Sequence, residues 1–209
     1  MRVIAIDGPA GSGKSTIARH LATELGVAYL DTGAMYRAVA FAALRRGVDP
    51  AAADSVAVIV RDLELDIGPD GVVVDGVDAT VEIRGPEVTK AVSAVAANPA
   101  VRAELVRRQR EWVASRGSAV VEGRDIGTVV FPDAELKAYL TARLDVRAGR
   151  RHQEVSDLDY DAVAADMARR DTVDTEREVD PLQQADDAVL IDTSDRSIDE
   201  IVADLMERL

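Results

Sequence analysis

The chain of 209 residues contains no cysteine and only two histidines, His20 and His152. Without cysteine there can be no disulfide, no cysteine-ligated zinc, no iron–sulfur cluster and no thiol nucleophile. With two histidines, a histidine-rich metal site is not expected either. These absences exclude thiol and metal-cluster chemistry as the basis of any function.

Long apolar runs and excess positive charge are also missing. No apolar run approaches the roughly 18 residues that span a bilayer, and the N-terminal segment reaches its glycines too early for a signal peptide. Acidic residues outnumber basic ones by 38 to 25, which gives a formal net charge of −13. Because such a surface repels phosphate backbones, we expect no nucleic-acid partner. Because neither a bilayer-spanning run nor a signal peptide is predicted, we expect a cytoplasmic protein with no membrane partner. Anion sites should then be local basic islands.

Strand and helix patterns alternate along the chain. Residues 3–6 form an apolar run typical of a buried parallel strand, and Ile17, Leu21 and Leu25 recur with helical spacing before Gly26. Further strands are predicted near residues 27–30, 119–121, 136–140 and 188–191, with helices near 34–46, 99–116 and 145–177 and a capping box at Ser197 and Glu200. This alternation predicts an α/β fold, a parallel sheet flanked by helices in a single domain over residues 1–209.

Residues 63–84 have a different texture. Two short runs of alternating or continuous apolar residues flank the turn formed by residues 68–71, and a second turn follows at Asp75 and Gly76. The pattern predicts a small antiparallel β insert within the α/β chain.

A glycine-rich loop lies between the first predicted strand and the first predicted helix. It matches G-x-x-x-x-G-K-[ST] with Gly8, Pro9, Ala10, Gly11, Ser12, Gly13, Lys14 and Ser15. Its backbone amides and the helix N-terminus attract phosphate, Lys14 should reach the β- and γ-phosphates, and the Ser15 hydroxyl should ligate Mg²⁺. A turn that binds nothing is the alternative. The strand–loop–helix context favours nucleoside triphosphate binding, without indicating what is done with the nucleotide.

Two polar blocks follow other predicted strands. Residues 31–37 include Tyr36 and Arg37, and residues 122–128 include Arg124 and Asp125. In doubly wound sheets, ligands bind beyond the carboxyl ends of the strands, so both blocks are candidate binding segments. Tyr36 alone is more typical of an aromatic residue packed in a helix, but Arg37 beside it is less easily explained in that way. Arg124 and Asp125 could instead form a surface salt bridge. The glycines of the second block favour the functional interpretation there.

A third basic island lies in the charged region near the C-terminus. It consists of Arg143, Arg147, Arg150, Arg151, Arg169, Arg170, Asp171, Asp174 and Arg177. Helical spacing places some of these arginines on one face. The simpler alternative is a solvent-exposed charged face, on which carboxylates such as Asp145 and Glu154 pair with the arginines. Lysine occurs only three times in the chain, and the guanidinium fork fits phosphate oxygens. We therefore favour a polyphosphate clamp.

Taken together, the motifs resemble those of bacterial cytidylate kinases, within the P-loop nucleoside-monophosphate kinase family. The resemblance is carried by residues 6–14, 31–37, 122–133 and 170–182. Glu122 stands where many relatives have aspartate. The resemblance implies a P-loop kinase fold in which a nucleoside-monophosphate-binding region, about residues 32–102, contains the β insert and about residues 147–170 form a helical lid.

The resemblance also implies a reaction, the transfer of a phosphoryl group from ATP to CMP or dCMP with Mg²⁺, and we expect the chain to act as a monomer. ATP would be held by residues Gly8 to Thr16, the acceptor phosphate by Thr32, Tyr36, Arg37, Arg124 and Arg177, cytosine by Ser93, Arg102 and Asp125, and ribose by Arg170 and Asp174. Arg147 and Arg151 would be lid arginines on the donor phosphates. The expected catalytic set is Lys14, Arg37, Arg124, Arg147, Arg151 and Arg177.

Two alternatives remain open. A P-loop kinase for shikimate, gluconate or dephospho-coenzyme A would need neither the β insert nor the cytosine-reading set. A nucleotide-dependent switch would carry a base-reading Asn-Lys-x-Asp tetrapeptide, which the sequence lacks. Phosphoryl transfer to a monophosphate needs positioning and charge neutralisation rather than a general base. This requirement fits a chain whose two histidines include no plausible catalytic base.

Overall fold

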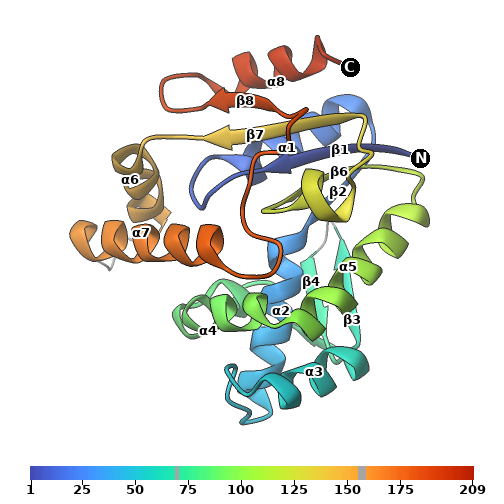
Figure 1. The fold of residues 1–209 in the computed structure, drawn as a ribbon, viewed down its shortest axis with the longest axis vertical. Coiled ribbons are helices and arrows are strands. Elements are labelled where there is room, and N and C mark those ends of the chain that lie inside the picture. The colour runs from blue at the N-terminus through green and yellow to red at the C-terminus, as the bar shows by residue number, and fades with distance from the viewer. Residues whose placement is uncertain (69–70, 155–158) are drawn as a thin grey trace. The chain divides into compact units, whose positions relative to one another are not determined.

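The computed structural model describes residues 1–68, 71–154 and 159–209. The chain divides into two compact units (Figure 1). Unit 1 combines Met1–Ala28 with Gly117–Leu209, and unit 2 is Tyr29–Arg116. The expected single domain over residues 1–209 stays a prediction.

A parallel sheet forms the centre of unit 1. The strands of this unit are β1 (Arg2–Asp7), β6 (Ser118–Gly123), β7 (Leu136–Thr141) and β8 (Val189–Asp192), in the order β6-β1-β7-β8. Strand β2 (Ala28–Asp31) begins at the last residue of the first segment of unit 1, and its residues Tyr29–Asp31 are assigned to unit 2. Strand β1 pairs in parallel with β6 and β7, and β7 pairs in parallel with β8. The apolar run at Ile4, Ala5 and Ile6 is fully buried in β1, as a strand covered on both faces requires. The predicted parallel sheet is confirmed.

Helices connect these strands. Unit 1 contains α1 (Lys14–Leu25), the π-helical turn η2 (Ile126–Val130), α6 (Leu144–Glu154), α7 (Tyr160–Glu176) and α8 (Ile198–Met206). Helix α1 ends where Gly26 adopts φ 64°, and the predicted capping box of Ser197 and Glu200 is present at the start of α8. Residues 155–158, which fall within the expected lid, lie outside the described residues.

Unit 2 consists of helices and the antiparallel insert. Its elements are α2 (Thr32–Arg45), α3 (Ala53–Asp62), β3 (Leu65–Gly68), β4 (Gly71–Val74), β5 (Val77–Asp78), η1 (Glu82–Arg84), α4 (Pro86–Ala97) and α5 (Pro99–Ala114). The three strands pair antiparallel in the order β3-β4-β5, which confirms the predicted insert. Pro69 and Asp70 of the predicted turn lie outside the described residues. Helix α3 was not predicted.

Helix α5 fixes the insert to the other helices of unit 2. The indole N–H of Trp112 donates to the carbonyl of Ile67 in β3 at 3.0 Å, and the Arg116 guanidinium lies 3.8 Å from the centre of the indole ring. The Arg108 guanidinium donates to the carbonyls of Leu63 and Val60, at the end of α3. Side chains of one helix thus satisfy backbone groups of the segment that leads into the insert.

The N-terminus of α5 offers a test of stability. The Asn98 side chain accepts from the backbone N–H of Ala100 at 3.0 Å, and its amide donates to the carbonyl of Ala53 in α3 at 2.8 Å. We expect Asn98→Ala to lower the free energy of unfolding by about 1–2 kcal/mol, since a cap and a buried hydrogen bond are lost. Urea denaturation measures the change. Asn98→Asp keeps the cap but not the donor to Ala53, so its loss should be smaller; an equal loss would contradict a capping role.

No helix in the described parts of the chain is long and apolar enough to cross a membrane.

Candidate functional site

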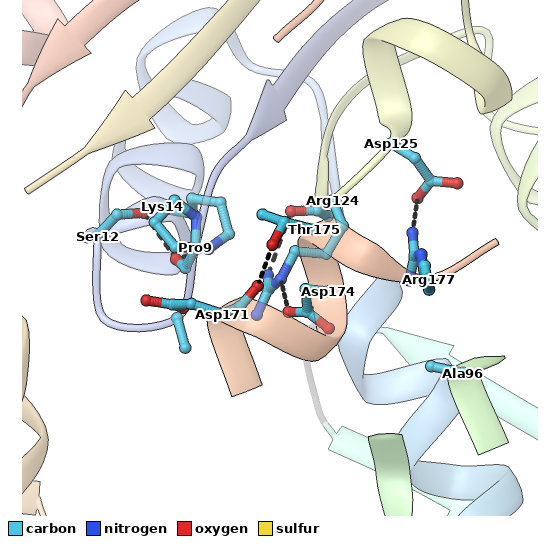
Figure 2. A network of polar contacts seen from close by, with 12 residues as sticks. Pro9, Ser12, Lys14, Ala96, Arg124, Asp125, Asp171, Asp174, Thr175 and Arg177 are labelled. Atoms are coloured by element: carbon cyan, nitrogen blue, oxygen red, sulfur yellow. Dashed lines mark hydrogen bonds and ion pairs between the residues drawn. The ribbon is translucent and has the colours of Figure 1, made fainter. Parts of the chain in front are cut away.

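The phosphate loop of unit 1 joins β1 to α1 and has a conformation that requires glycine. Gly8 has φ 145°, and a Cβ there would overlap the carbonyl oxygen of Leu140. Gly11 has φ 73°, and a Cβ there would lie 2.8 Å from the Met167 methyl group of α7. The Ser12 hydroxyl and the Lys14 ammonium both donate to the carbonyl of Pro9, at 3.0 and 2.6 Å (Figure 2). Hydrogen bonds within the loop therefore fix its conformation, and the Leu140 backbone and the Met167 side chain pack against its glycines.

Lys14 is a buried cation at the start of α1. Only 6% of its surface is exposed. Burial, followed by the charge of Arg124, lowers the pKa of Lys14 to about 7, while Glu122 and Asp7 act in the opposite direction. An anion beside this ammonium would favour its protonated form. The electrostatics thus agree with the phosphate-binding role predicted for Lys14.

Arg147 is attached to the phosphate loop. Its guanidinium donates to the carbonyls of Ala10 and Ala142, at 3.1 and 3.0 Å, and pairs with Asp171 of α7 at 2.7 Å. The predicted lid arginine is thus buried, and it links α6, α7 and the loop. Its role on the donor phosphates stays a prediction.

Two other arginines of the third island, Arg143 and Arg151, are more exposed than Arg147. Arg151 pairs with Glu154 at 2.8 Å, and Arg143 pairs with Asp195 and lies 3.6 Å from Asp145. For these two side chains the structure shows the carboxylate pairing that the simpler alternative describes. A phosphate-binding role for Arg151 stays a prediction.

Thr193 is a residue of this region that sequence reasoning missed. It directly follows β8, is 2% exposed, and donates its hydroxyl to the carbonyl of Ser12 in the phosphate loop at 3.0 Å. Arg150 donates to the Thr193 hydroxyl at 3.0 Å and to its carbonyl at 2.7 Å. Its position after the carboxyl end of a parallel strand is the signal that could have found it.

The second basic group of unit 1 gathers around Arg124, just past β6. Its guanidinium donates to the Asp174 carboxylate of α7 at 2.7 Å (Figure 2). Burial alone would lower the pKa of Arg124, but the charge and hydrogen bond of Asp174 raise it. Burial, followed by the like charge of Arg124, lowers the pKa of Arg170. The structure thus brings together three of the predicted acceptor-binding residues.

Asp125 and Arg177 form a buried pair in the same unit. The Arg177 Nη2 atom lies 3.8 Å from the Asp125 Oδ1 atom, and the Arg177 Nε–H donates to the carbonyl of Asp180 at 2.6 Å. The two side chains are 6–7% exposed. Figure 2 shows Arg177 directed at Asp125.

The remaining predicted residues belong to unit 2. Arg37 donates to the carbonyl of Ile83 and the hydroxyl of Thr89, at 3.1 and 2.9 Å. Arg102 is 2% exposed, with its guanidinium 5.7 Å from the centre of the Tyr36 ring. Thr32 is buried at the start of α2, and Ser93 is half-buried in α4. Asp31 caps α2 through the N–H of Ala34 and pairs with Arg84 at 3.0 Å, so the 31–37 block is anchored to η1.

A magnesium ion would find one predicted ligand, the half-buried Ser15 hydroxyl in the first turn of α1. Mg²⁺ keeps several waters and is usually bound by one or two protein oxygens together with substrate phosphates, so a single hydroxyl beside a phosphate loop fits this ion. Among the described residues there is no cluster of three or more histidine, aspartate or glutamate side chains that could hold a metal.

Solved structures share this fold at low sequence identity. An uncharacterized protein from Eubacterium ventriosum superposes with a TM-score of 0.55 over 99% of this chain and 97% of its own, at 13% identity. A protein from Thermus thermophilus superposes with a TM-score of 0.51 over 100% of this chain and 97% of its own, at 20% identity. At such identities the likeness shows the fold alone.

Sequence comparisons reach further. A family model described as cytidylate kinase matches residues 4–209. The chain is 52% identical over 211 aligned residues to a cytidylate kinase of Nocardia farcinica, covering 97% of this chain and 91% of that protein. It is 51% identical to a cytidylate kinase of Mycobacterium leprae, covering 98% and 94% of the two chains. With the phosphate loop and the Arg124 group in place, the chain belongs to the cytidylate kinase family.

Proposed function

We propose that the chain transfers the γ-phosphoryl group of ATP to CMP and dCMP, forming CDP and dCDP. The observation that carries this proposal lies within unit 1. A glycine-dependent phosphate loop holds the buried Lys14, and the charge of Arg124, just past the neighbouring strand β6, acts on that ammonium. Family membership supports a monophosphate acceptor over shikimate, gluconate or dephospho-coenzyme A.

The chemistry needs little beyond positioning. The loop amides and Lys14 would hold the donor phosphates and stabilise the charge that develops on the transferred group. Ser15 and the donor phosphates would hold Mg²⁺, which would supply further charge neutralisation. The acceptor phosphate is already an anion, so its attack requires no protein base.

Arg124 and Arg170 are the residues of unit 1 best suited to the acceptor. Burial and the like charge of Arg124 disfavour the charged form of Arg170, so an anion between them would relieve a repulsion. Asp174 orients Arg124 through its 2.7 Å hydrogen bond. The acceptor roles of Thr32, Tyr36, Arg37, Ser93 and Arg102 of unit 2, and of Asp125 and Arg177 of unit 1, are part of this proposal and stay predictions. The ribose-binding roles of Arg170 and Asp174 also stay predictions.

A coupled assay for ADP tests the proposal. We expect CMP and dCMP to be phosphorylated with kcat/KM about 10²-fold or more above UMP and AMP, because a site that pairs with a base rejects one with mismatched donors. Turnover of shikimate, gluconate or dephospho-coenzyme A in place of CMP would contradict it, as would ATP hydrolysis without transfer. Two further predictions are that the protein is cytoplasmic and that it is a monomer. Gel filtration tests the second.

A further inference from the structure

The last residue of β1, Asp7, is buried and is not used by the proposed chemistry. It is 5% exposed, directly precedes Gly8 of the phosphate loop, and lies in register between Gly123 of β6 and Tyr139 of β7. Its carboxylate accepts two backbone N–H groups, that of Ile126 at 2.8 Å on Oδ1 and that of Gly127 at 2.8 Å on Oδ2. Both amides belong to the first residues of η2.

The segment that Asp7 holds carries two of the proposed acceptor residues. Arg124 and Asp125 directly precede Ile126 in the chain, between the end of β6 and η2. The approach is close, since a Cβ at position 127 would lie 3.1 Å from the Lys137 side chain, which would have to shift by a few tenths of an ångström, and in van der Waals contact with the Asp7 carboxylate at 3.5 Å. One carboxylate thus joins the start of the donor-binding loop to the backbone of the acceptor-binding segment.

We infer that Asp7 is a positioning residue, which sets the backbone of residues 124–127 relative to the phosphate loop so that Arg124 and Asp125 meet the acceptor in the geometry needed for transfer. This inference rests on the proposed function. It assigns Asp7 no contact with either nucleotide. The two hydrogen bonds are charge-assisted and buried, and such bonds restrict geometry more strongly than neutral ones.

The negative charge of Asp7 does not stabilise the folded state at neutral pH. Burial, with a contribution from Asp125, raises the pKa of Asp7 to about 6, although the two amides and Lys14 lower it. A carboxyl pKa above its value of 3.8 in the unfolded chain means that the ionised form costs folding free energy at neutral pH. A buried carboxylate kept at such a cost is typical of a functional position.

Asp7→Asn tests the inference. The amide oxygen can accept one of the two N–H groups, but its NH₂ group cannot accept the other. We expect kcat/KM for CMP to fall about 10- to 100-fold, as for a lost charge-assisted hydrogen bond, while the dissociation constant for ATP changes less than about threefold. Amide hydrogen exchange should rise in peptides covering residues 124–131 and not in those of the phosphate loop. Ile6→Val, a matched change in the same buried strand, should leave all three measurements unchanged.

A pH series separates positioning from a general structural role. The wild-type to Asp7→Asn ratio of kcat/KM should be large above pH 7 and approach one below about pH 5, because wild-type Asp7 is then protonated. Titration of the CMP phosphate occurs in both proteins and cancels in the ratio. Lys14, Asp125 and Tyr139 face Asp7 and are present in both proteins. Because the charge of Asp7 raises the pKa of Lys14, the dissociation constant for ATP is measured at each pH, so that a changed Lys14 charge is distinguished from a changed acceptor segment.

Three results would overturn the inference: an unchanged kcat/KM for CMP in Asp7→Asn, equal losses of ATP and CMP binding, or unchanged exchange over residues 124–131. If Asp7→Asn does not fold, Asp7→Ser, whose hydroxyl can accept one N–H, takes its place in each measurement. A wild-type protein inactive on CMP would contradict the proposed function instead. The exchange experiment would still decide whether Asp7 holds the segment.

Discussion

Lys14→Ala should lower kcat for CMP phosphorylation by about 10²–10³-fold or more, since the variant loses a preorganised positive charge where negative charge develops. The fold should survive, because burial of this ammonium disfavours its charged form and so opposes folding at neutral pH. Steady-state kinetics with CMP measure the loss, and circular dichroism checks the fold. A folded Lys14→Ala protein with nearly normal turnover would remove the phosphate loop from the mechanism.

Lys14→Met is the matched control for Lys14→Ala, because it removes the charge but keeps the length of the side chain. It also allows the effect of the charge on stability to be measured. The pKa of Lys14 is about 7 in the folded protein against 10.5 in the unfolded chain, so the unfolded state binds more protons between these values. The free energy of unfolding due to this group therefore rises from about pH 7 to pH 10.5. Lys14→Met should raise Tm of the nucleotide-free protein at pH 7 by at least about 2–4 °C, which is the shift for each kcal/mol in a chain of this size. A lower Tm would show that Lys14 supports the fold.

Asp125→Asn should lower kcat/KM for CMP about 10²-fold and reduce the ratio of CMP to UMP activity at least tenfold. Cytosine presents an amino group at N4, from which a carboxylate can accept a hydrogen bond. Uracil presents the carbonyl oxygen O4 at the same place, and a carboxylate repels it. The asparagine amide can turn its NH₂ group toward that oxygen. ATP affinity should stay nearly unchanged. The measurement is kcat/KM for both pyrimidine nucleotides on the wild type and this variant.

The buried Arg177 supplies the competing explanation for Asp125. With Nη2 3.8 Å from Oδ1, the carboxylate could serve only to balance the Arg177 charge. That role predicts equal losses for CMP and UMP, because neither base would contact position 125. An unchanged ratio would therefore end the base-reading assignment, whatever the loss in absolute activity.

Local patterns predicted most of the fold. The apolar run of β1 and the capping box at Ser197 each depend on residues a few positions apart, and the structure confirms both. Helix α3 was missed although it buries Val56, Ile59 and Val60 with helical spacing. A search of residues 53–62 for that spacing would have found it.

Long-range pairs could not be predicted in the same way. The turn η2 depends on Asp7, whose carboxylate binds the N–H of Ile126, 119 positions later, and no local pattern links the two. The hydrogen bond of Arg124 to Asp174 spans 50 positions. The position of the phosphate loop between β1 and α1, by contrast, was predicted, because its glycines, lysine and hydroxyl are contiguous in the sequence. Its contacts with Arg147 and Thr193 come from distant segments and were not predicted.

The single tryptophan of the chain makes unit 2 the only part that intrinsic indole fluorescence can report. Trp112 is held by its hydrogen bond to Ile67 in β3, and the Arg116 guanidinium covers its ring. Its emission therefore senses the β insert and the end of α5, whereas far-ultraviolet circular dichroism averages over the helices and strands of both units. Denaturation curves from the two methods coincide only if the units unfold together. This one side chain thus provides an optical probe of cooperativity that needs no label.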